Sequence, residues 1–187
     1  SRDERAFWVV SMLSASAIAY GAATIVNAIA TGKGAALGVD LWTKAKVELT
    51  DEPDVIEGRI LSDRDEDTDL INRVIRRVLR RFKVEGEHGA FVETSSNIPI
   101  ARGMKSSSSA ANAISLATVA ALRKKLSDLE VVKLGVDAAK DAGVTITGAF
   151  DDACASYFGN IVVTDNVAQQ VKRRFRVDGD YAVLFYV

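Results

Sequence analysis

The stretch Pro99-Ile-Ala-Arg-Gly-Met-Lys-Ser-Ser-Ser-Ser-Ala-Ala111 places a proline, a glycine, a lysine and four consecutive serines ahead of small helix-forming residues. Residues 90–98 before it have the composition of a strand, and residues 107–125 after its start have that of a helix. A strand, a polar loop and a helix N-terminus together can bind phosphate, because the backbone N–H groups of the loop and of the first helical turn converge on one point. The stretch therefore predicts an anion site.

The loop differs from the common nucleotide-binding loop. That loop requires Gly-x-x-x-x-Gly-Lys-Ser/Thr, whereas Met104 separates Gly103 from Lys105 in this chain. One serine is sufficient to cap a helix, so the run Ser106 to Ser109 beside a lysine favours an anion site over a cap alone. The hydroxyls can act as additional donors or as ligands for Mg²⁺. We therefore expect a phosphate loop of another kind.

Composition limits the class of protein. The 187 residues, 48% of them hydrophobic, are enough for one domain, or for one domain and part of another. With 24 basic and 25 acidic residues, net charge gives no reason to expect a nucleic-acid or membrane partner. No run of 18 apolar residues is present, so the sequence predicts no membrane span. The single cysteine, Cys154, excludes an internal disulfide framework and favours a reducing cytoplasm.

Hydrophobic periodicity predicts strands and helices in an α+β order. The predicted helices cover residues 66–82, 107–125 and 128–142. The predicted strands cover residues 15–29 (split at Gly21), 41–49, 55–61, 90–98, 144–147, 161–164, 171–177 and 181–187. The last strand ends with the chain, which we interpret as a sign of a protein fragment.

Two other groups of residues have ordinary structural explanations. Arg76, Arg77, Arg80 and Arg81 near the end of the first predicted helix suit the helix dipole, so we interpret them as a solvated face rather than a nucleic-acid patch. Cys154 lies among small residues, and we expect a packed thiol rather than a nucleophile.

The adjacent carboxylates Asp151 and Asp152 follow a glycine turn and form the second candidate constellation. If this segment is a strand or a turn, their side chains point in opposite directions, so that one faces a site and the other caps a helix or faces solvent. A carboxylate near a bound phosphate donor can position and deprotonate a substrate hydroxyl or hold Mg²⁺. A helix N-cap explains the pair equally well.

Three segments together resemble a known family. Pro99-x-x-x-Gly-Met-Lys-Ser-Ser107 is similar to the second motif of the GHMP kinases, Pro-x-x-x-Gly-Leu-Gly-Ser-Ser-Ala. With Ala22-Ala-Thr-Ile-Val-Asn-Ala-Ile-Ala-Thr-Gly-Lys-Gly-Ala-Ala36 and Thr147-Gly-Ala-Phe-Asp-Asp-Ala-Cys-Ala-Ser-Tyr-Phe-Gly159, it resembles the archaeal-type shikimate kinase branch. The resemblance runs from about residue 17 to residue 187. Lys105, in place of a glycine, is one departure from the wider motif; Arg102 and Ser109 are minor ones.

The resemblance implies an amino-terminal domain like domain 2 of ribosomal protein S5, followed in the family by a ferredoxin-like domain with a third glycine-rich motif. We therefore expect residues 1–13 to be an extension and residues 14–187 to be the ATP-binding domain. The ferredoxin-like domain is then missing or truncated, although its start can lie at the end of this chain. This departure puts the activity of the isolated chain in doubt.

The resemblance also implies ATP-dependent phosphorylation of a shikimate hydroxyl in the cytoplasm, with ATP and Mg²⁺ and without nucleic acid or membrane partners. Asp151 matches the family aspartate that can act as base, and Ser107 matches the serine that can ligate Mg²⁺. The acceptor pocket would include Asn27, Thr31 and Lys33. The residues expected to bind ATP form one continuous loop: Pro99, Ile100, Ala101, Arg102, Gly103, Met104, Lys105, Ser106, Ser107, Ser108 and Ser109. The cation for the shikimate carboxylate stays open among Lys33, Arg102 and Lys105.

Three alternatives remain at this stage. The first is a related kinase acting on homoserine or a mevalonate-like alcohol. The second is a noncatalytic S5-like binding module, for RNA among other ligands, supported only by the arginines between residues 73 and 81. The third is an inactive kinase fragment that self-associates through an exposed edge.

Overall fold

The computed structural model describes residues 13–99, 106–145 and 149–184. The phosphate-loop residues 100–105 and part of the strand predicted at 144–147 lie outside the described residues. The elements in chain order are β1 (Ser14–Val26), β2 (Lys33–Thr50), β3 (Ile56–Ile60), α1 (Asp69–Arg81), β4 (Gly89–Ser96), α2 (Ser107–Ala121), α3 (Asp128–Asp141), α4 (Phe150–Phe158), β5 (Ile161–Asp165) and β6 (Gln170–Phe175). The predicted α+β class is confirmed.

The sheet is organised around β2. One edge of β2 pairs antiparallel with β1 along nearly its whole length. The other edge pairs with β5 over Lys33–Leu37 and with β4 over Thr43–Thr50. The outer strands β3 and β6 pair with β4 and β5 respectively, giving the order β3-β4-β2-β5-β6 with β1 beside β2. A single long strand therefore joins two smaller groups of strands.

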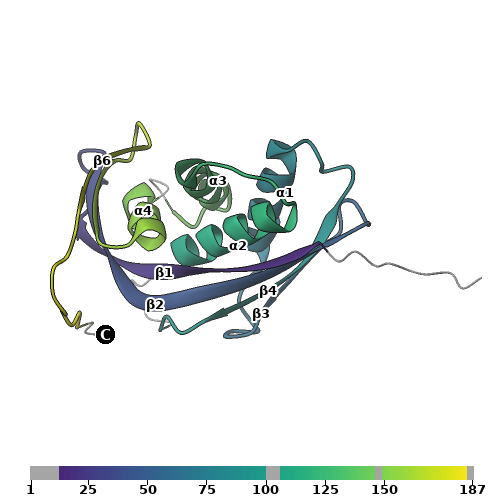
Figure 1. Ribbon diagram of the computed structural model, residues 1–187, viewed down its shortest axis with the longest axis horizontal. Helices are drawn as coiled ribbons and strands as arrows, with labels where there is room; N and C mark the ends of the chain where they lie inside the picture. The colour runs from purple at the N-terminus through teal and green to yellow at the C-terminus, as the bar shows by residue number, and fades with distance from the viewer. Residues whose placement is uncertain (1–12, 100–105, 146–148, 185–187) are drawn as a thin grey trace, which may run out of the picture.

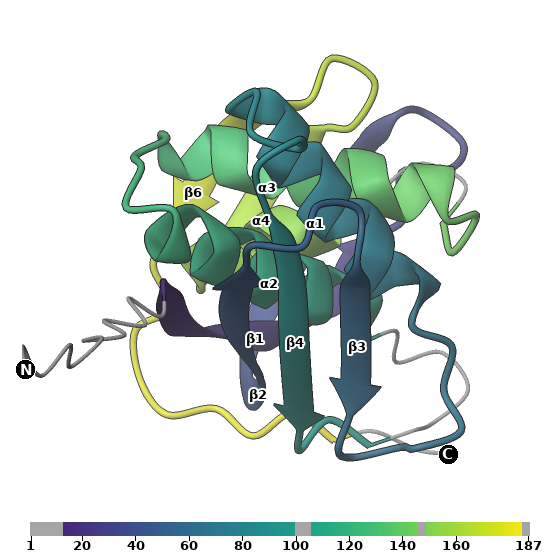
Figure 2. The same cartoon turned by 90° about the vertical axis from the view of Figure 1, so that its right-hand side faces the viewer.

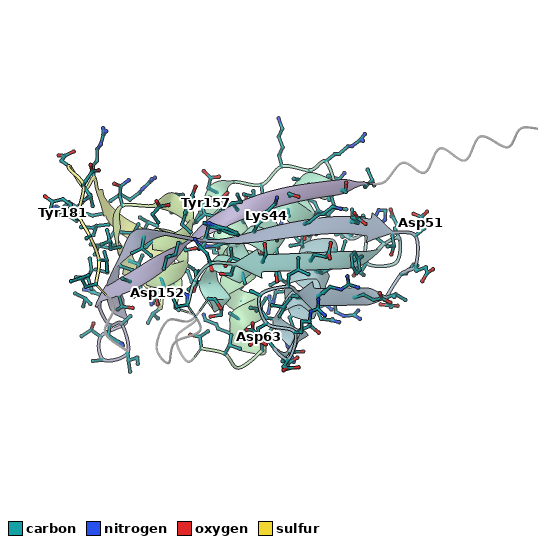
Figure 3. The ribbon with its side chains drawn as sticks, turned by 90° about the horizontal axis from the view of Figure 1, so that it is seen from below. Lys44, Asp51, Asp63, Asp152, Tyr157 and Tyr181 are labelled. Atoms are coloured by element: carbon teal, nitrogen blue, oxygen red, sulfur yellow. The ribbon has the colours of Figure 1, made fainter. Side chains whose placement is uncertain are left out.

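The helices cover one face of this sheet, as Figures 1 and 2 show. Alternation along β2 explains why only one face is covered. Ala45 and Val47 are fully buried, whereas Lys44 and Lys46, which alternate with them, are exposed. Figure 3 views the uncovered face, on which Lys44 projects. Lys46 pairs there with Glu48, and Arg59 with Glu93. The uncovered face is thus a solvated one.

The central helix α2 contacts β1, β2 and the other three helices. Its buried side chains are mostly small and lie all around the helix. Small side chains let neighbouring backbones approach closely, and a Cβ added at Gly135 of α3 would lie 3.1 Å from Ala111 Cβ of α2. The N-terminus of α2, where the serines lie, is therefore held in a fixed place relative to the sheet.

The arginines of α1 lie on a solvated face and pair with acidic groups. Arg76 pairs with Asp54, Arg77 with Asp141 of α3, and Arg81 with Glu130 of α3. The interpretation of this run as a solvated face is thereby supported. Among the helices that the structure describes, none is long and apolar enough to cross a membrane.

Three local expectations were wrong. Asp151 and Asp152 lie in the first turn of α4, which the periodicity did not reveal because its nine residues are mainly small and carry no clear apolar stripe. Val144 and Thr145 are not in a strand, since the chain there leaves α3 toward α4. Residues 181–184 form no strand either; Leu184 is 94% exposed, with no neighbouring strand to pair with in the part described.

The contact between α4 and β2 depends on two glycines. A Cβ at Gly34 would lie 2.5 Å from Asp151 Oδ2, at the start of α4. A Cβ at Gly38 would lie 2.8 Å from the carbonyl oxygen of Ala155, at the other end of the same helix. Figure 1 shows β1 and β2 bending around α4 at this end of the sheet. The absence of a side chain at Gly34 and Gly38 therefore lets α4 lie directly on the strand.

We expect Gly38→Ala to lower the free energy of unfolding by about 1–3 kcal/mol, because backbone atoms of α4 must move away from the added methyl group. Urea denaturation monitored by circular dichroism measures the change. Gly86→Ala is the matched control, since a Cβ there meets nothing within 4 Å. Equal stability of Gly38→Ala and Gly86→Ala would show that α4 does not depend on this close contact.

Candidate functional site

Asp151 lies at the start of α4 in a nearly closed environment. It is only 4% exposed, and its Oδ1 accepts a hydrogen bond from Asn166 Nδ2 at 2.9 Å. Its Oδ2 lies against the backbone of Gly34, in the space that a side chain would fill. Among the described residues, no donor is bonded to Oδ2. As far as the described residues show, the predicted catalytic carboxylate therefore has a hydrogen-bond donor on one oxygen and none on the other.

Asp152 has different surroundings although it is the next residue. Neighbours in a helix are turned by about 100° rather than pointing in opposite directions, so the expectation based on a strand or turn was wrong. Asp152 Oδ1 accepts from Thr24 Oγ1 of β1 at 2.9 Å. Burial, and secondarily the charge of Asp151, raise the pKa of Asp152 to about 6, against the opposing effect of the Thr24 hydrogen bond. Figure 3 shows Asp152 far from Asp51, which follows β2.

The predicted acceptor segment is the turn between β1 and β2. Asn27 Oδ1 accepts from the N–H of Ile29, and Thr31 bonds locally to the backbone of Lys33. All three predicted residues, Asn27, Thr31 and Lys33, are exposed. Thr24 and Gly34, which flank this turn, contact Asp152 and Asp151 respectively. The structure therefore brings the acceptor segment and the carboxylate pair to the same end of the sheet.

The serines at the start of α2 divide into two groups. Ser106, Ser107 and Ser108 are half-buried, and no described side chain caps the N-terminus of the helix. Ser109 is 2% exposed; its hydroxyl lies 2.8 Å from Thr43 Oγ1 of β2 and bonds to the carbonyl oxygen of Ser106. The Ser109 hydroxyl thus anchors α2 to the sheet, and any phosphate contact of Ser109 is left to its backbone. Pro99 precedes the loop and is exposed, while Ile100 to Lys105 lie outside the described residues.

A cavity of about 190 Å³ opens beside Ser106 and Ser107. It lies between the start of α2, the ends of β3 and β4, and the segment that leads into α1. Its walls combine the apolar Ile60, Leu70 and Ile114 with the acidic Glu66. Burial, and secondarily the charge of Asp63, raise the pKa of Glu66. This cavity was not predictable from the sequence, because its walls come from five separate segments.

Asn112 connects α2, which begins with the serines, to α4, which carries Asp151 and Asp152. It is 1% exposed on α2, and its Nδ2 donates to the carbonyl oxygen of Ala153 at 2.9 Å and to Ser156 Oγ at 3.1 Å on α4. Because a buried amide without partners is costly, these bonds select one position of α4 along α2. Asn112 therefore couples the two predicted halves of the site. The sequence did not reveal its role, since a polar residue in a helix has many uses.

The described side chains give little support for a metal site or for a reactive thiol. In the part of the chain that is described, no group of three His, Cys, Asp or Glu residues could hold a metal ion. Cys154 is fully buried, and burial with the nearby charge of Asp151 raises the pKa of its thiol to about 12. The prediction of a packed, unreactive thiol is supported.

Comparison with known proteins identifies relatives of the chain. Residues 69–160 match the family described as GHMP kinases N terminal domain. A shikimate kinase of Methanosarcina mazei is 52% identical over 174 residues, which are 93% of this chain and 58% of that protein. Shikimate kinases of Methanococcoides burtonii and Pyrococcus abyssi are 54% and 52% identical over 89% of the chain. The chain spans about three fifths of the length of these curated relatives.

Solved structures with the same fold are more distant in sequence. The mevalonate kinase of Methanococcus jannaschii superposes with a TM-score of 0.69 at 19% identity, over 91% of this chain and 57% of that chain. A homoserine kinase of Cytophaga hutchinsonii superposes with a TM-score of 0.65 at 16% identity, over 80% of this chain and 48% of that chain. At these identities the likeness concerns the fold alone.

The raised pKa of Asp152 predicts a pH-dependent stability. Between pH 3.8 and about 6 the folded protein binds more protons at this site than the unfolded chain, so the free energy of unfolding falls as pH rises. We expect Asp152→Asn to remove this fall. The variant should match the wild type near pH 4 and exceed its stability at pH 7 by at most about 3 kcal/mol, from roughly two pKa units.

Urea denaturation at several pH values measures this difference. Asp178→Asn is the control, because its side chain is 91% exposed. A difference between Asp152→Asn and the wild type that stays constant from pH 4 to pH 7 would contradict the raised pKa.

Proposed function

Because the chain belongs to the GHMP kinase family, we propose that the protein transfers the γ-phosphoryl group of ATP to a hydroxyl of shikimate. The observation that carries the proposal is the placement of Asp151, a buried carboxylate of which one oxygen has no donor from the residues that the structure describes. Asp151 lies beside the acceptor turn, and Asn112 couples its helix to α2, where the serines lie. The identity near 50% to archaeal shikimate kinases supports the choice of acceptor. We assign ATP binding to residues 14–187 and retain a following ferredoxin-like domain as part of this proposal.

We assign the ATP phosphates to the loop from Pro99 to Ser109. Backbone N–H groups at the start of α2 favour negative charge there, and Lys105 would offset charge on the transferred group. Mg²⁺ would be carried by the nucleotide phosphates, with the Ser107 hydroxyl as the ligand from the protein. The cavity beside Ser106 and Ser107 is large enough for part of the nucleoside, and its mixed apolar and polar walls suit a ring with exocyclic polar groups.

In the transfer step, the acceptor oxygen attacks the γ-phosphorus while the bond from that phosphorus to the β,γ-bridging oxygen breaks. The acceptor proton passes to Asp151 Oδ2, and ADP leaves with the bridging oxygen. Most of the rate enhancement in such reactions comes from positioning and charge stabilisation. The Asp151 carboxylate, which is buried in the first turn of α4 and bonded to Asn166, meets the need for positioning.

The acceptor side would contain Asn27, Thr31 and Lys33. Shikimate carries a carboxylate, and Lys33 is exposed on the strand end next to Gly34, which contacts Asp151. Lys33 is therefore the cation that we favour for the acceptor carboxylate. Arg102 and Lys105 remain the alternatives that the sequence suggested. We place the protein in a reducing cytoplasm, in keeping with the buried free thiol of Cys154.

The two competing functions have weaker support. Homoserine and mevalonate kinases share the fold at 16% to 19% identity, whereas shikimate kinases are relatives at about 50%. An RNA-binding role would use the arginines of α1, but Arg73, Arg76, Arg77 and Arg81 pair with acidic side chains.

We expect Asp151→Asn to lower kcat for shikimate phosphorylation by about 10²–10⁴-fold in the complete protein, with the Kd for ATP little changed, because only the proton acceptor is lost. A coupled ADP-release assay with shikimate, homoserine and mevalonate, together with calorimetric titration of ATP, measures both quantities. Asp178→Asn is the control. Phosphorylation of mevalonate or homoserine in preference to shikimate would overturn the acceptor assignment, and unchanged turnover would remove Asp151 from the mechanism.

We expect Ser107→Ala to raise the Mg²⁺ concentration needed for half-maximal activity by about tenfold, because one oxygen ligand is lost. Ser115→Ala is a matched control on the same helix, since its hydroxyl is buried and bonded to no described atom. Titration of activity with MgCl₂ at fixed ATP gives the two curves. Coincident curves for the two variants would exclude Ser107 as a ligand.

A further inference from the structure

The two oxygens of Asp151 are held differently. Oδ1 accepts from Asn166 Nδ2 at 2.9 Å, while Oδ2 has no hydrogen-bond donor among the described residues. Asn166 is itself 3% exposed and directly follows β5. Its side chain is therefore a buried polar group that touches the proposed base and that the mechanism has not yet used.

The orientation of the Asn166 amide follows from its two neighbours. An ionised carboxylate can only accept, so the NH₂ group must face Asp151 and the Oδ1 atom must face Thr164. Thr164 Oγ1 lies 2.7 Å from Asn166 Oδ1 and donates to it. Thr164 is fully buried, so its hydroxyl has no water to bond instead. The carboxylate of Asp151 thus sets the orientation of the amide, and the hydrogen bond from Thr164 supports that orientation.

The β2–β5 pairing places Thr164, where these hydrogen bonds begin, beside Gly34 and therefore near Asp151. Thr164 is the register partner of Gly34, and partners in an antiparallel pair project to the same face of the sheet. Gly34 has no side chain, and Asp151 Oδ2 lies in the space this leaves. The carboxylate is therefore held by a donor on Oδ1, while Oδ2 borders the space that the missing Gly34 side chain leaves.

A purely structural role for the Asn166 side chain is less well supported. The turn after β5 is already attached to the acceptor segment by the backbone, because the Asn166 N–H donates to the carbonyl oxygen of Gly32 at 2.7 Å. Asp165 Oδ1 also accepts from the N–H of Ala168 within the turn. Within the described part of the chain, the side-chain amide bonds to Thr164 and Asp151 and to no other residue.

We propose that Asn166, oriented by Thr164, is a positioning residue that holds Asp151 Oδ1 and thereby directs Oδ2 toward the acceptor hydroxyl. We call the hydrogen bonds from Thr164 to Asn166 and from Asn166 to Asp151 the clamp. The expected effect of the clamp on kcat rests on the proposed function, whereas the clamp itself does not. Removing the clamp leaves substrate binding in place and lets the carboxylate rotate away from the acceptor. A misplacement of about 1 Å can cost about 100-fold in rate.

The kinetic test uses Asn166→Ala, Thr164→Val and Thr164→Ser in the complete protein, with Thr118→Val as the control. Thr118 is also a fully buried threonine with a bonded hydroxyl, but it lies in the second half of α2. We expect Asn166→Ala to lower kcat by about 100-fold with little change in KM for ATP, and Thr164→Val to lower it less. Thr164→Ser, which keeps the hydroxyl, should restore most of the activity, and Thr118→Val should leave it unchanged.

A double-mutant cycle separates positioning from general damage. In the Asp151→Asn background no base is left to position, so adding Asn166→Ala should change kcat by less than about twofold. A further loss near 100-fold in that background would overturn the proposal, as would an equal loss in Thr118→Val.

A measurement without turnover keeps the clamp distinct from the proposed function. In NMR spectra of this chain, the side-chain amide protons of Asn166 should exchange with solvent more slowly than those of exposed Asn27, and Asp151→Ala should remove the difference. Fast exchange in the unaltered chain would refute the clamp. Slow exchange in a protein that phosphorylates none of the three acceptors would support the clamp and refute the kinase proposal.

Discussion

The close contact between α4 and β2 is the constraint on which the candidate site depends. Two glycines on one strand, Gly34 and Gly38, leave space for both ends of a nine-residue helix. Since interiors are packed to near-crystalline density, a side chain at Gly38 would force the backbone of α4 to move, and one at Gly34 would displace the Asp151 side chain. The contact brings the carboxylates of α4 against the turn between β1 and β2, and the bonds of Asn112 relate the same helix to the serines of α2.

Adjacent carboxylates in one helical turn acquire different properties from their neighbours. Asp151 has a donor amide on one oxygen, while Asp152 has a hydroxyl from β1 and a pKa raised to about 6 by burial and by the charge beside it. A like charge this close disfavours ionisation, and it adds to the effect of burial at Asp152, while the Thr24 hydroxyl opposes both. The two carboxylates therefore differ because their partners come from different segments, β1 for Asp152 and the residue after β5 for Asp151.

Elements with a clear apolar period were predictable from the sequence. The stripe through Ile71, Val74 and Val78 predicted α1, and the alternation over residues 41–49 predicted the second half of β2, because burial on one face imposes these periods. Helix α4 was missed, since small residues buried on several sides leave no stripe. Sequence motifs also indicated candidate site residues, namely the serines, Asp151 and the acceptor turn, and their roles stay predictions. Asn112, Asn166 and the cavity beside Ser107 were not indicated, because single polar residues acquire a role only from what they contact.

By itself the sequence determined the class of fold, the family and the chemical groups available, since these follow from periodicity and from residues close together in the chain. Only the tertiary structure decided how those groups are used. It turned the Ser109 hydroxyl into an anchor for α2, and it gave Asp151 Oδ1 an amide donor from a residue fifteen positions away. The physical reason is that hydrogen bonding and burial depend on distances in space, and the register of β2 with β5 sets those distances.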